Sequence, residues 1–161
     1  MKKIKAVFQY TVYSSLDELS NEERKLLKFA TNAGENAYAP YSKFKVGAAV
    51  LLDNGQVVIG SNQENASYPS GLCAERVAVF QAGALYPEVK INMIAITAKS
   101  LNYIVDKPAA PCGNCRQSIA EYEQKQKSPI AILLKGETGD IIKCNSLSDL
   151  LPFAFDNSFL K

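Results

Sequence analysis

Three of the four cysteines lie in two short motifs that could bind a metal ion. Cys73 opens a Cys-Ala-Glu motif, and Cys112 and Cys115 belong to a Pro-Cys-Gly-Asn-Cys motif. Cys112 and Cys115 are three residues apart, so on the first turn of a helix their sulfur atoms point the same way and could grip one tetrahedral ion. The unpaired N–H groups at a helix start favour thiolate over thiol. Three thiolates with an open fourth position are typical of a catalytic zinc site, because a structural site is normally closed by a fourth protein ligand.

The fourth cysteine, Cys144, stands apart from this pattern. It falls in the last predicted strand, with no helix start beside it. It could in principle fill the fourth ligand position, but the sequence favours a buried small hydrophobic residue, which is the common environment of a free cysteine.

Glu75 and Arg76, which follow Cys73 in the sequence, could assist a metal ion bound by the cysteines. Glu75 is close enough to reach a metal-bound water without binding the metal, which is where a proton shuttle belongs. The alternative for Glu75 alone is a solvated acid near a helix N-terminus, but its combination with the two cysteine motifs favours the shuttle. Three thiolates give a zinc site a net negative charge, and hydrogen bonds from the Arg76 guanidinium to the sulfurs would restore part of its electrophilicity.

The composition excludes several other kinds of site. The 161 residues include no histidine, which rules out Ser-His-Asp and Cys-His nucleophile pairs, histidine-ligated metals and a histidine general base. The net charge is +2, and the hydrophobic and charged fractions are 47% and 21%, which is ordinary for a globular protein. So small a charge provides no basic surface for a polynucleotide and favours a small partner.

The N-terminal sequence predicts neither export nor membrane insertion. Lysines precede an apolar stretch, but Gln9, Tyr10 and Thr11 interrupt it and no small-residue cleavage pattern follows. No apolar run reaches about 18 residues, so no transmembrane helix is expected. We therefore expect a cytoplasmic protein, in which thiols stay reduced and a Cys-x-x-Cys motif is metal-binding or catalytic.

Turn and capping signals divide the chain into the elements that must position these motifs. A Ser-Asn-Glu-Glu capping box at 20–23 opens a helix that reaches about Tyr38, ahead of Pro40. An Asp-Asn-Gly hairpin signal at 53–55 joins the first two strands of the domain. The predicted strands are 43–52, 56–61, 91–98, 130–134 and 141–145, and the further helices are 73–83, 111–125 and 148–155.

Strands that alternate with helices predict an α/β fold. We expect a three-layer α/β/α sandwich, in which a five-stranded mixed sheet carries helices on both faces. The chain shows no repeat and no linker, so residues 20–161 are predicted to form a single domain, and residues 1–19 an N-terminal arm or an extra strand. In this arrangement Cys73 and Cys112 each lie at the start of a helix.

Four motifs between about residues 36 and 155 together carry a resemblance to a known family. They are Ala39-Pro40-Tyr41-Ser42-Lys43-Phe44-Lys45-Val46-Gly47-Ala48-Ala49, Asn62-Gln63-Glu64-Asn65-Ala66, Cys73-Ala74-Glu75-Arg76 and Pro111-Cys112-Gly113-Asn114-Cys115-Arg116-Gln117. In this order they closely resemble the small, homotetrameric, zinc-dependent cytidine deaminases of nucleoside salvage. The resemblance implies one zinc ion per chain on Cys73, Cys112 and Cys115, with Glu75 as both acid and base.

The same resemblance implies a set of substrate contacts. In the family, the residues that match Asn62 and Glu64 hold the ribose 3′-hydroxyl. The residue that matches Phe44 packs against the base, and backbone near Ala66 and Cys73 contacts the pyrimidine. The residues that match Tyr68 and Phe155 reach the site of a neighbouring subunit. Without the resemblance, each of these side chains would be interpreted as ordinary packing or as a polar strand exit.

The chain departs from the family pattern in two places. Residues 1–19 form an extra N-terminal segment, and Phe153 occupies a position where relatives commonly have glycine. We expect the bulk of Phe153 to reshape the rim of the neighbouring pocket.

The implied reaction is the hydrolytic deamination of cytidine and 2′-deoxycytidine to the uridines, in pyrimidine salvage. A 3′-phosphodiester would bring negative charge against Glu64, so the expected partner is a small nucleoside and neither a nucleic acid polymer nor a membrane. Two alternatives stay open: a deaminase of another cytosine-bearing or modified nucleoside, and a non-catalytic zinc or dithiol protein. A dithiol protein would need neither Cys73 nor Glu75.

Overall fold

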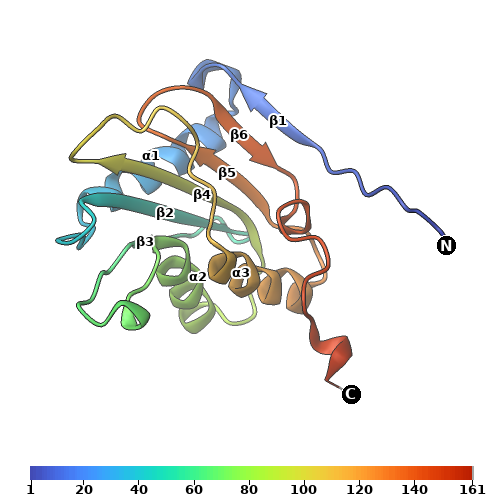
Figure 1. Ribbon diagram of the computed structural model, residues 1–161. Coiled ribbons are helices and arrows are strands. Elements are labelled where there is room, and N and C mark those ends of the chain that lie inside the picture. The colour runs from blue at the N-terminus through green and yellow to red at the C-terminus, as the bar shows by residue number, and fades with distance from the viewer. Residues whose placement is uncertain (161) are drawn as a thin grey trace.

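Six strands form one mixed sheet at the centre of the molecule. The computed structural model describes residues 1–160, and Figure 1 shows the strands side by side from one edge to the other. Their order is β1-β6-β5-β4-β2-β3, in which β4 and β5 are parallel and every other neighbouring pair is antiparallel. The strands are β1 (Tyr10–Tyr13), β2 (Phe44–Leu52), β3 (Val57–Ser61), β4 (Ile91–Ser100), β5 (Ala131–Lys135) and β6 (Ile141–Cys144).

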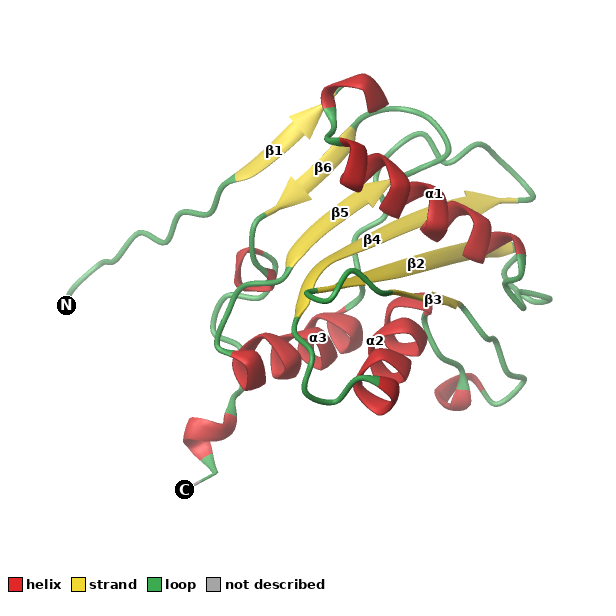
Figure 2. Cartoon of the chain, turned by 180° about the vertical axis from the view of Figure 1, so that it is seen from behind, coloured by secondary structure: helices red, strands yellow, loops and turns green. Residues whose placement is uncertain are grey.

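Helices cover both faces of this sheet. Helix α1 (Asn21–Glu35) lies on one face, and α2 (Ala74–Leu85) and α3 (Gly113–Gln126) lie on the other, as Figure 2 shows from behind. The three-layer α/β/α sandwich with a mixed sheet is therefore confirmed. Within residues 1–160, no helix has the length and apolar character needed to cross a bilayer.

The side chains of β2 show how the sheet separates two cores. Ala48, Val50 and Leu52 point to the α2 and α3 side, whereas Ala49 and Leu51 point to the α1 side. Successive side chains of a strand alternate between faces, so a strand that is apolar throughout is buried on both. This explains the uninterrupted uncharged run of β2 from Val46 to Leu52, which follows the partly buried Lys45 near the start of the strand.

Helix α1 begins as the sequence predicts. The Ser20 hydroxyl accepts a hydrogen bond from the Glu23 N–H, and the Glu23 carboxylate accepts one from the Ser20 N–H, which is a complete capping box. Glu23 is also buried against the sheet, where Lys143 Nζ of β6 donates to its Oε1 at 2.7 Å. One carboxylate thus both caps α1 and ties it to the sheet.

The sheet contains six strands where five were predicted. Tyr10–Tyr13 pairs with β6 along its length, with Tyr10 opposite Cys144 and Tyr13 opposite Ile141. The segment consists of β-branched and aromatic residues that suit a strand. Its partner is distant in the sequence, so local pattern alone could not decide between a free arm and a sixth strand.

The helix predicted at 148–155 is wrong. The chain there forms only short 3₁₀ turns, at Leu147–Asp149 and Asn157–Phe159. Pro152 has no N–H to continue a helix, and Phe153 adopts the left-handed region with φ 60°, which interrupts right-handed helical geometry.

Two helix ends also differ from prediction. Helix α2 continues to Leu85 instead of stopping at Gly83, because that glycine serves packing: a Cβ there would meet Tyr122 Oη of α3 at 2.5 Å. Helix α1 ends at Glu35 and not near Tyr38. The Tyr38 N–H instead donates to the Asn62 carbonyl at 3.0 Å, which begins the approach to the site.

Two glycines set the close approach of helices to the sheet. A Cβ on Gly47 of β2 would lie 1.9 Å from the Ala30 carbonyl oxygen of α1, and a Cβ on Gly60 of β3 would lie 2.5 Å from the Ala78 nitrogen of α2. Only a residue without a side chain lets these backbones pack so closely. Gly60 therefore holds α2 against β3 at the distance that places the start of α2.

Candidate active site

A cavity of about 770 Å³ brings together four segments that are far apart in the sequence. It lies between the start of β2, the loop that follows β3, the start of α2 and the loop that leads into α3. The side chains that line it include Phe44, Asn62, Glu64, Tyr68, Cys73, Glu75, Arg76 and Cys112. Its volume is in the range of pockets that hold a small molecule.

Three cysteines meet at the base of this region. Cys73 and Cys112 are the N-cap residues of α2 and α3, and Cys115 is fully buried on the first turn of α3. The Sγ atoms of Cys73 and Cys112 are 3.9 Å apart, those of Cys112 and Cys115 are 3.6 Å apart, and all three lie within 4.8 Å of one another. Zn–S bonds of about 2.3 Å in a tetrahedron place sulfurs about 3.8 Å apart, so this cluster fits a zinc ion.

The charge state of the cluster also suits a metal. A hydrogen bond from the Cys115 thiol, supported by the Cys112 thiol and the Arg76 charge, lowers the pKa of Cys73 to about 5. The same bond to the Cys73 thiolate, together with burial, raises the pKa of Cys115. Cys73 is thus favoured as a thiolate, and a bound cation would take the place of thiol protons in the cluster.

Glu75 is a buried carboxyl group on the first turn of α2, with 5% of its surface exposed. Burial, and the nearby Cys73 charge, raise the pKa of Glu75 above its usual value. It lines the same cavity as Cys73 and Cys112. A carboxyl group whose pKa is moved toward neutrality can both accept and return a proton, which is what acid–base chemistry requires.

Arg76 extends beside the cluster. Its guanidinium charge helps to lower the pKa of Cys73 and limits the rise in the pKa of Glu75, and its Nη2 atom donates to the Gly71 carbonyl at 3.3 Å. Its buried Nε has no hydrogen-bond acceptor among residues 1–160. A buried donor without an acceptor is costly, and a metal-bound thiolate beside it would be a suitable acceptor. The predicted contact between Arg76 and the sulfurs therefore stays a prediction.

Asn62 and Glu64 line the cavity and are held by backbone of the opposite wall. Asn62 Nδ2 donates to the Phe44 carbonyl at 2.9 Å, and its Oδ1 accepts from the Val46 N–H at 2.8 Å. Glu64 Oε2 accepts from the Tyr41 N–H at 2.9 Å and the Ser42 N–H at 3.3 Å. Burial opposes ionisation of Glu64, but these hydrogen bonds outweigh it and lower its pKa, so it stays a carboxylate.

The structure does not bring every predicted substrate residue to the cavity. Phe44 and Tyr68 line it, with Tyr68 largely exposed at its mouth, whereas Ala66 and Phe155 are outside the lining of the chain's own cavity. Phe155 is exposed and stacks on Phe159 at 5.4 Å between ring centroids. Its backbone carbonyl accepts from Gln117 Nε2 at 2.9 Å, which anchors the C-terminal segment to α3.

Several cavity residues carried no role in the sequence interpretation. Tyr41, Asn65 and Asn114 line the cavity, and the Tyr41 ring lies 6.2 Å from that of Tyr68. All three belong to motifs already identified, so their place in those motifs was the available signal. Cys144 is buried in the core on the α2 and α3 side and is not part of the metal cluster, which agrees with the favoured interpretation.

Comparison with known proteins shows that the chain is similar to cytidine deaminases. Residues 20–129 match the family model described as "Cytidine and deoxycytidylate deaminase zinc-binding region". The chain is 40% identical over 134 residues to a cytidine deaminase of Halalkalibacterium halodurans, which covers 83% of this chain and 94% of that protein. It is 38% identical to a cytidine deaminase of Sporosarcina psychrophila, over 84% and 93% of the two chains.

A solved structure shows the same architecture. The crystal structure of a cytidine deaminase from Burkholderia pseudomallei superposes with a TM-score of 0.71 and 39% sequence identity, over 85% of this chain and all of that one. The match therefore extends over both cysteine motifs and the helices that present them.

Proposed function

The chain belongs to the cytidine and deoxycytidylate deaminase family, and from this premise we propose that it hydrolyses cytidine and 2′-deoxycytidine to the uridines and ammonia. The enzyme is a zinc-dependent hydrolase, and pyrimidine salvage is the process that this reaction serves. The single observation that carries the proposal is a buried Glu75 that lines one cavity with Cys73 and Cys112, two members of a three-cysteine cluster that fits a metal ion. A non-catalytic dithiol protein is not favoured, because it would need neither Glu75 nor the third sulfur.

The thiolates of Cys73, Cys112 and Cys115 would hold the zinc ion. When bound, zinc supplies the Lewis acidity that makes hydroxide available near neutral pH. Among residues 1–160, these three sulfurs form the group placed to hold an ion, and Cys144 lies in the core. This leaves a position for chemistry, as in catalytic zinc sites.

Glu75 carries the protons in the proposed reaction. It accepts a proton from water and delivers it to ring N3 of the base as the water oxygen bonds to C4. It then takes the remaining proton from the new C4 hydroxyl and gives it to the amino group, so that the C4–N bond breaks and the C4 carbonyl forms. The overall change consumes one water and releases one ammonia. Burial favours the neutral carboxylic acid after the first transfer, and the Arg76 charge favours the carboxylate before it, so neither form is trapped.

Asn62 and Glu64 are proposed to recognise the sugar. The Glu64 carboxylate has acceptor capacity beyond its bonds to Tyr41 and Ser42, which suits a 3′-hydroxyl donor. A 2′-hydroxyl is not required by this contact, so both ribo- and deoxyribonucleosides fit. A 3′-phosphodiester would place like charge against Glu64 and would be rejected. Phe44 at the cavity wall would pack on the base.

We also propose a homotetramer in the cytoplasm. Tyr68 at the cavity mouth and Phe155 on the C-terminal segment are exposed aromatic side chains, and such residues are enriched in interfaces. In this arrangement Tyr68 and Phe155 would each contribute to a neighbouring subunit's site. A reducing compartment is consistent with cysteines that serve as metal ligands.

An ultraviolet assay tests the function directly. The protein is incubated with cytidine, 2′-deoxycytidine, adenosine and a short single-stranded DNA, and zinc is measured in the same sample. We expect turnover of the first two substrates only and one zinc per chain. Metal-free protein that reduces disulfides would contradict the proposal.

A substitution separates the role of Glu75 from the fold. Glu75→Gln should retain zinc and lose roughly 100- to 10,000-fold in kcat, the usual range for a lost acid–base group. Glu22→Gln, at an exposed position of α1, is the matched control and should leave both unchanged. Near-normal turnover in Glu75→Gln would refute the assigned role.

A further inference from the structure

Strand β1 leaves one edge of the sheet open. It pairs with β6 on one side, and no strand among residues 1–160 pairs with its other side. Its four residues, Tyr-Thr-Val-Tyr, include no charge and no proline, the features that usually protect an edge. Tyr10 and Val12 are 54% and 47% exposed. This is an edge suited to pairing with another strand.

The residues before β1, which we call the arm (residues 1–9), continue the same character. The arm runs extended, and its N-terminal part leads away from the rest of the chain, as Figures 1 and 2 both show, whereas residues 7–9 lie beside Pro129 and Asn145. Ile4, Val7 and Phe8 in it are exposed, and the Phe8 ring stacks on that of Tyr10 at 6.1 Å. Exposed apolar side chains in a segment that continues directly into an unpaired edge strand indicate an interaction surface.

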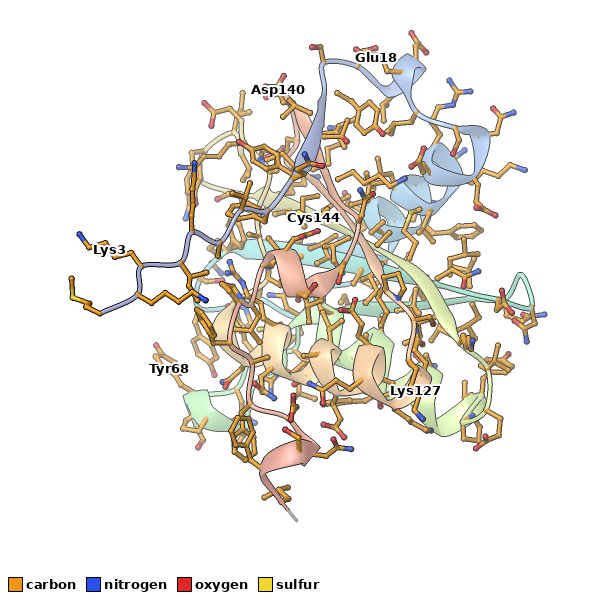
Figure 3. The ribbon with its side chains drawn as sticks, turned by 90° about the vertical axis from the view of Figure 1, so that its right-hand side faces the viewer. Lys3, Glu18, Tyr68, Lys127, Asp140 and Cys144 are labelled. Carbon is orange, nitrogen blue, oxygen red and sulfur yellow. The ribbon has the colours of Figure 1, made fainter. Side chains whose placement is uncertain are left out.

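Charge is divided between the two ends of this segment. Lys2, Lys3 and Lys5 lie in the arm, whereas Asp17 and Glu18 lie in the 3₁₀ turn (Leu16–Glu18) that follows β1, which we call the acidic turn. Figure 3 shows Lys3 at the free end of the arm and Glu18 beyond the opposite end of β1. The segment is therefore basic, then uncharged, then acidic.

We infer that β1 and the arm pair with β1 and the arm of a second copy of this chain, antiparallel about a two-fold axis. In an antiparallel pair, each basic arm lies beside the other copy's acidic turn. A parallel pair would instead place lysines against lysines. A segment with this polarity is complementary to itself in one orientation only, as an isologous interface requires.

A second copy fits these features better than a polyanion does. A nucleic acid or an anionic lipid surface would attract the lysines, but it would be repelled by Asp17 and Glu18 and would leave the open edge of β1 without partners. A second copy gives the lysines and the backbone edge a partner, and it adds to the contacts that Asp17 makes with Arg24 at 3.7 Å and Glu18 with the Ser14 N–H at 3.1 Å. The inference is independent of the proposed function, because no residue of the arm, β1 or the acidic turn lines the active-site cavity.

Two charge-reversed variants test the pairing. The first is Lys3→Glu with Lys5→Glu, and the second is Asp17→Lys with Glu18→Lys. Each variant alone carries like charge on both ends, so we expect the apparent dissociation constant for self-association to rise by roughly 10-fold or more. An equal mixture restores both attractive contacts in a mixed pair. Sedimentation velocity at low salt measures particle size in the parent, each variant and the mixture.

The expected result is a smaller particle for each variant and a particle of parent size for the mixture. Lys25→Glu with Lys28→Glu, two exposed lysines of α1, is the matched control and should behave as the parent. Zinc content and deaminase activity report on folding in every sample. Equal particle sizes in all samples, or smaller variants that mixing fails to restore, would overturn the inference. Association through other surfaces does not disturb the comparison, because the variants differ only beside β1.

Discussion

Gly60 of β3 packs against the backbone of α2, the helix that carries Glu75. A Cβ there would lie 2.5 Å from the Ala78 nitrogen and 2.6 Å from the Ala74 carbonyl oxygen, both in the backbone of α2. Gly60→Ala must therefore move the helix and not merely a side chain. Helix α2 begins at Ala74, immediately after Cys73, and carries Glu75 on its first turn.

The size of the displacement follows from ordinary contact distances. A real Cβ keeps at least about 3.0 Å from such atoms and usually about 3.4 Å, so α2 must retreat by roughly 0.5–0.9 Å. Overpacking of this kind costs about 1–3 kcal/mol of unfolding free energy, or roughly 2–12 °C in Tm for a domain of this length. A shift of about 1 Å in a catalytic group can cost about 100-fold in rate. We expect kcat/KM for cytidine to fall by about 10- to 100-fold.

The assay compares kcat/KM, zinc content and Tm for Gly60→Ala and a control. Gly55→Ala, in the turn between β2 and β3, is the control: a Cβ there meets nothing within 4 Å, but φ is +81°. The left-handed backbone costs about 1–2 kcal/mol with alanine without moving α2. It should lower Tm and leave kcat/KM unchanged.

The outcome separates positioning from stability. A Gly60→Ala enzyme with a lowered Tm but normal kcat/KM and zinc content would refute the argument that β3 positions the site through α2. Equal losses of kcat/KM in both variants would show that general destabilisation, and not the position of Glu75, sets the rate.

The other predictions concern the metal and the fold. Cys73→Ala should lose its zinc, because only two sulfurs of the cluster remain. Cys144→Ala, at a buried core position, should keep zinc and lose only stability. Zinc content is measured by elemental mass spectrometry, and zinc retained by Cys73→Ala would contradict the ligand set. Arg76→Gln should lower zinc affinity, kcat or both by about 10-fold or more. Chelator competition measures the affinity and a turnover assay measures kcat, and unchanged values would contradict the proposed role of Arg76. Hydrogen bonds from Lys143 and Ser20 outweigh burial and lower the pKa of Glu23 in the folded protein. The stability that the Glu23 carboxylate adds is therefore present above its unfolded pKa near 4.5, and it is lost as the pH falls through the pKa of the folded state. Glu23→Gln should therefore lower the free energy of unfolding, measured in urea, by about 2 kcal/mol at pH 7. The difference should shrink as the pH falls below 4.5, and a difference that stays constant with pH would contradict this assignment.

Much of the fold could be predicted because its signals are local. The Ser20 and Glu23 capping box, the Asp-Asn-Gly turn and the apolar run of β2 each depend on residues within a few positions of one another. Local backbone preferences and side-chain periodicity act whether or not distant segments of the chain are in contact. The same holds for Cys112 and Cys115, whose spacing within one helical turn already indicates a shared ion.

Other features depended on contacts between distant segments. Gly83 reads as a helix stop, but it serves packing against Tyr122, so α2 continues past it. The strand at Tyr10–Tyr13 needed β6 to complete its hydrogen bonds. At the C-terminus, the left-handed backbone at Phe153 and the bond from Gln117 to the Phe155 carbonyl replaced the helix predicted there.

The sequence by itself determined which residues are available for the proposed chemistry: three cysteines and one glutamate in ordered motifs, with histidine chemistry excluded by composition. The tertiary structure decided where that chemistry takes place. The sulfurs of Cys73 and Cys112, 39 residues apart in the chain, are 3.9 Å apart only because α2 and α3 lie on the same face of the sheet with their N-termini together. Burial then raises the pKa of Glu75, and no local pattern encodes burial, because it is a property of everything packed around the side chain.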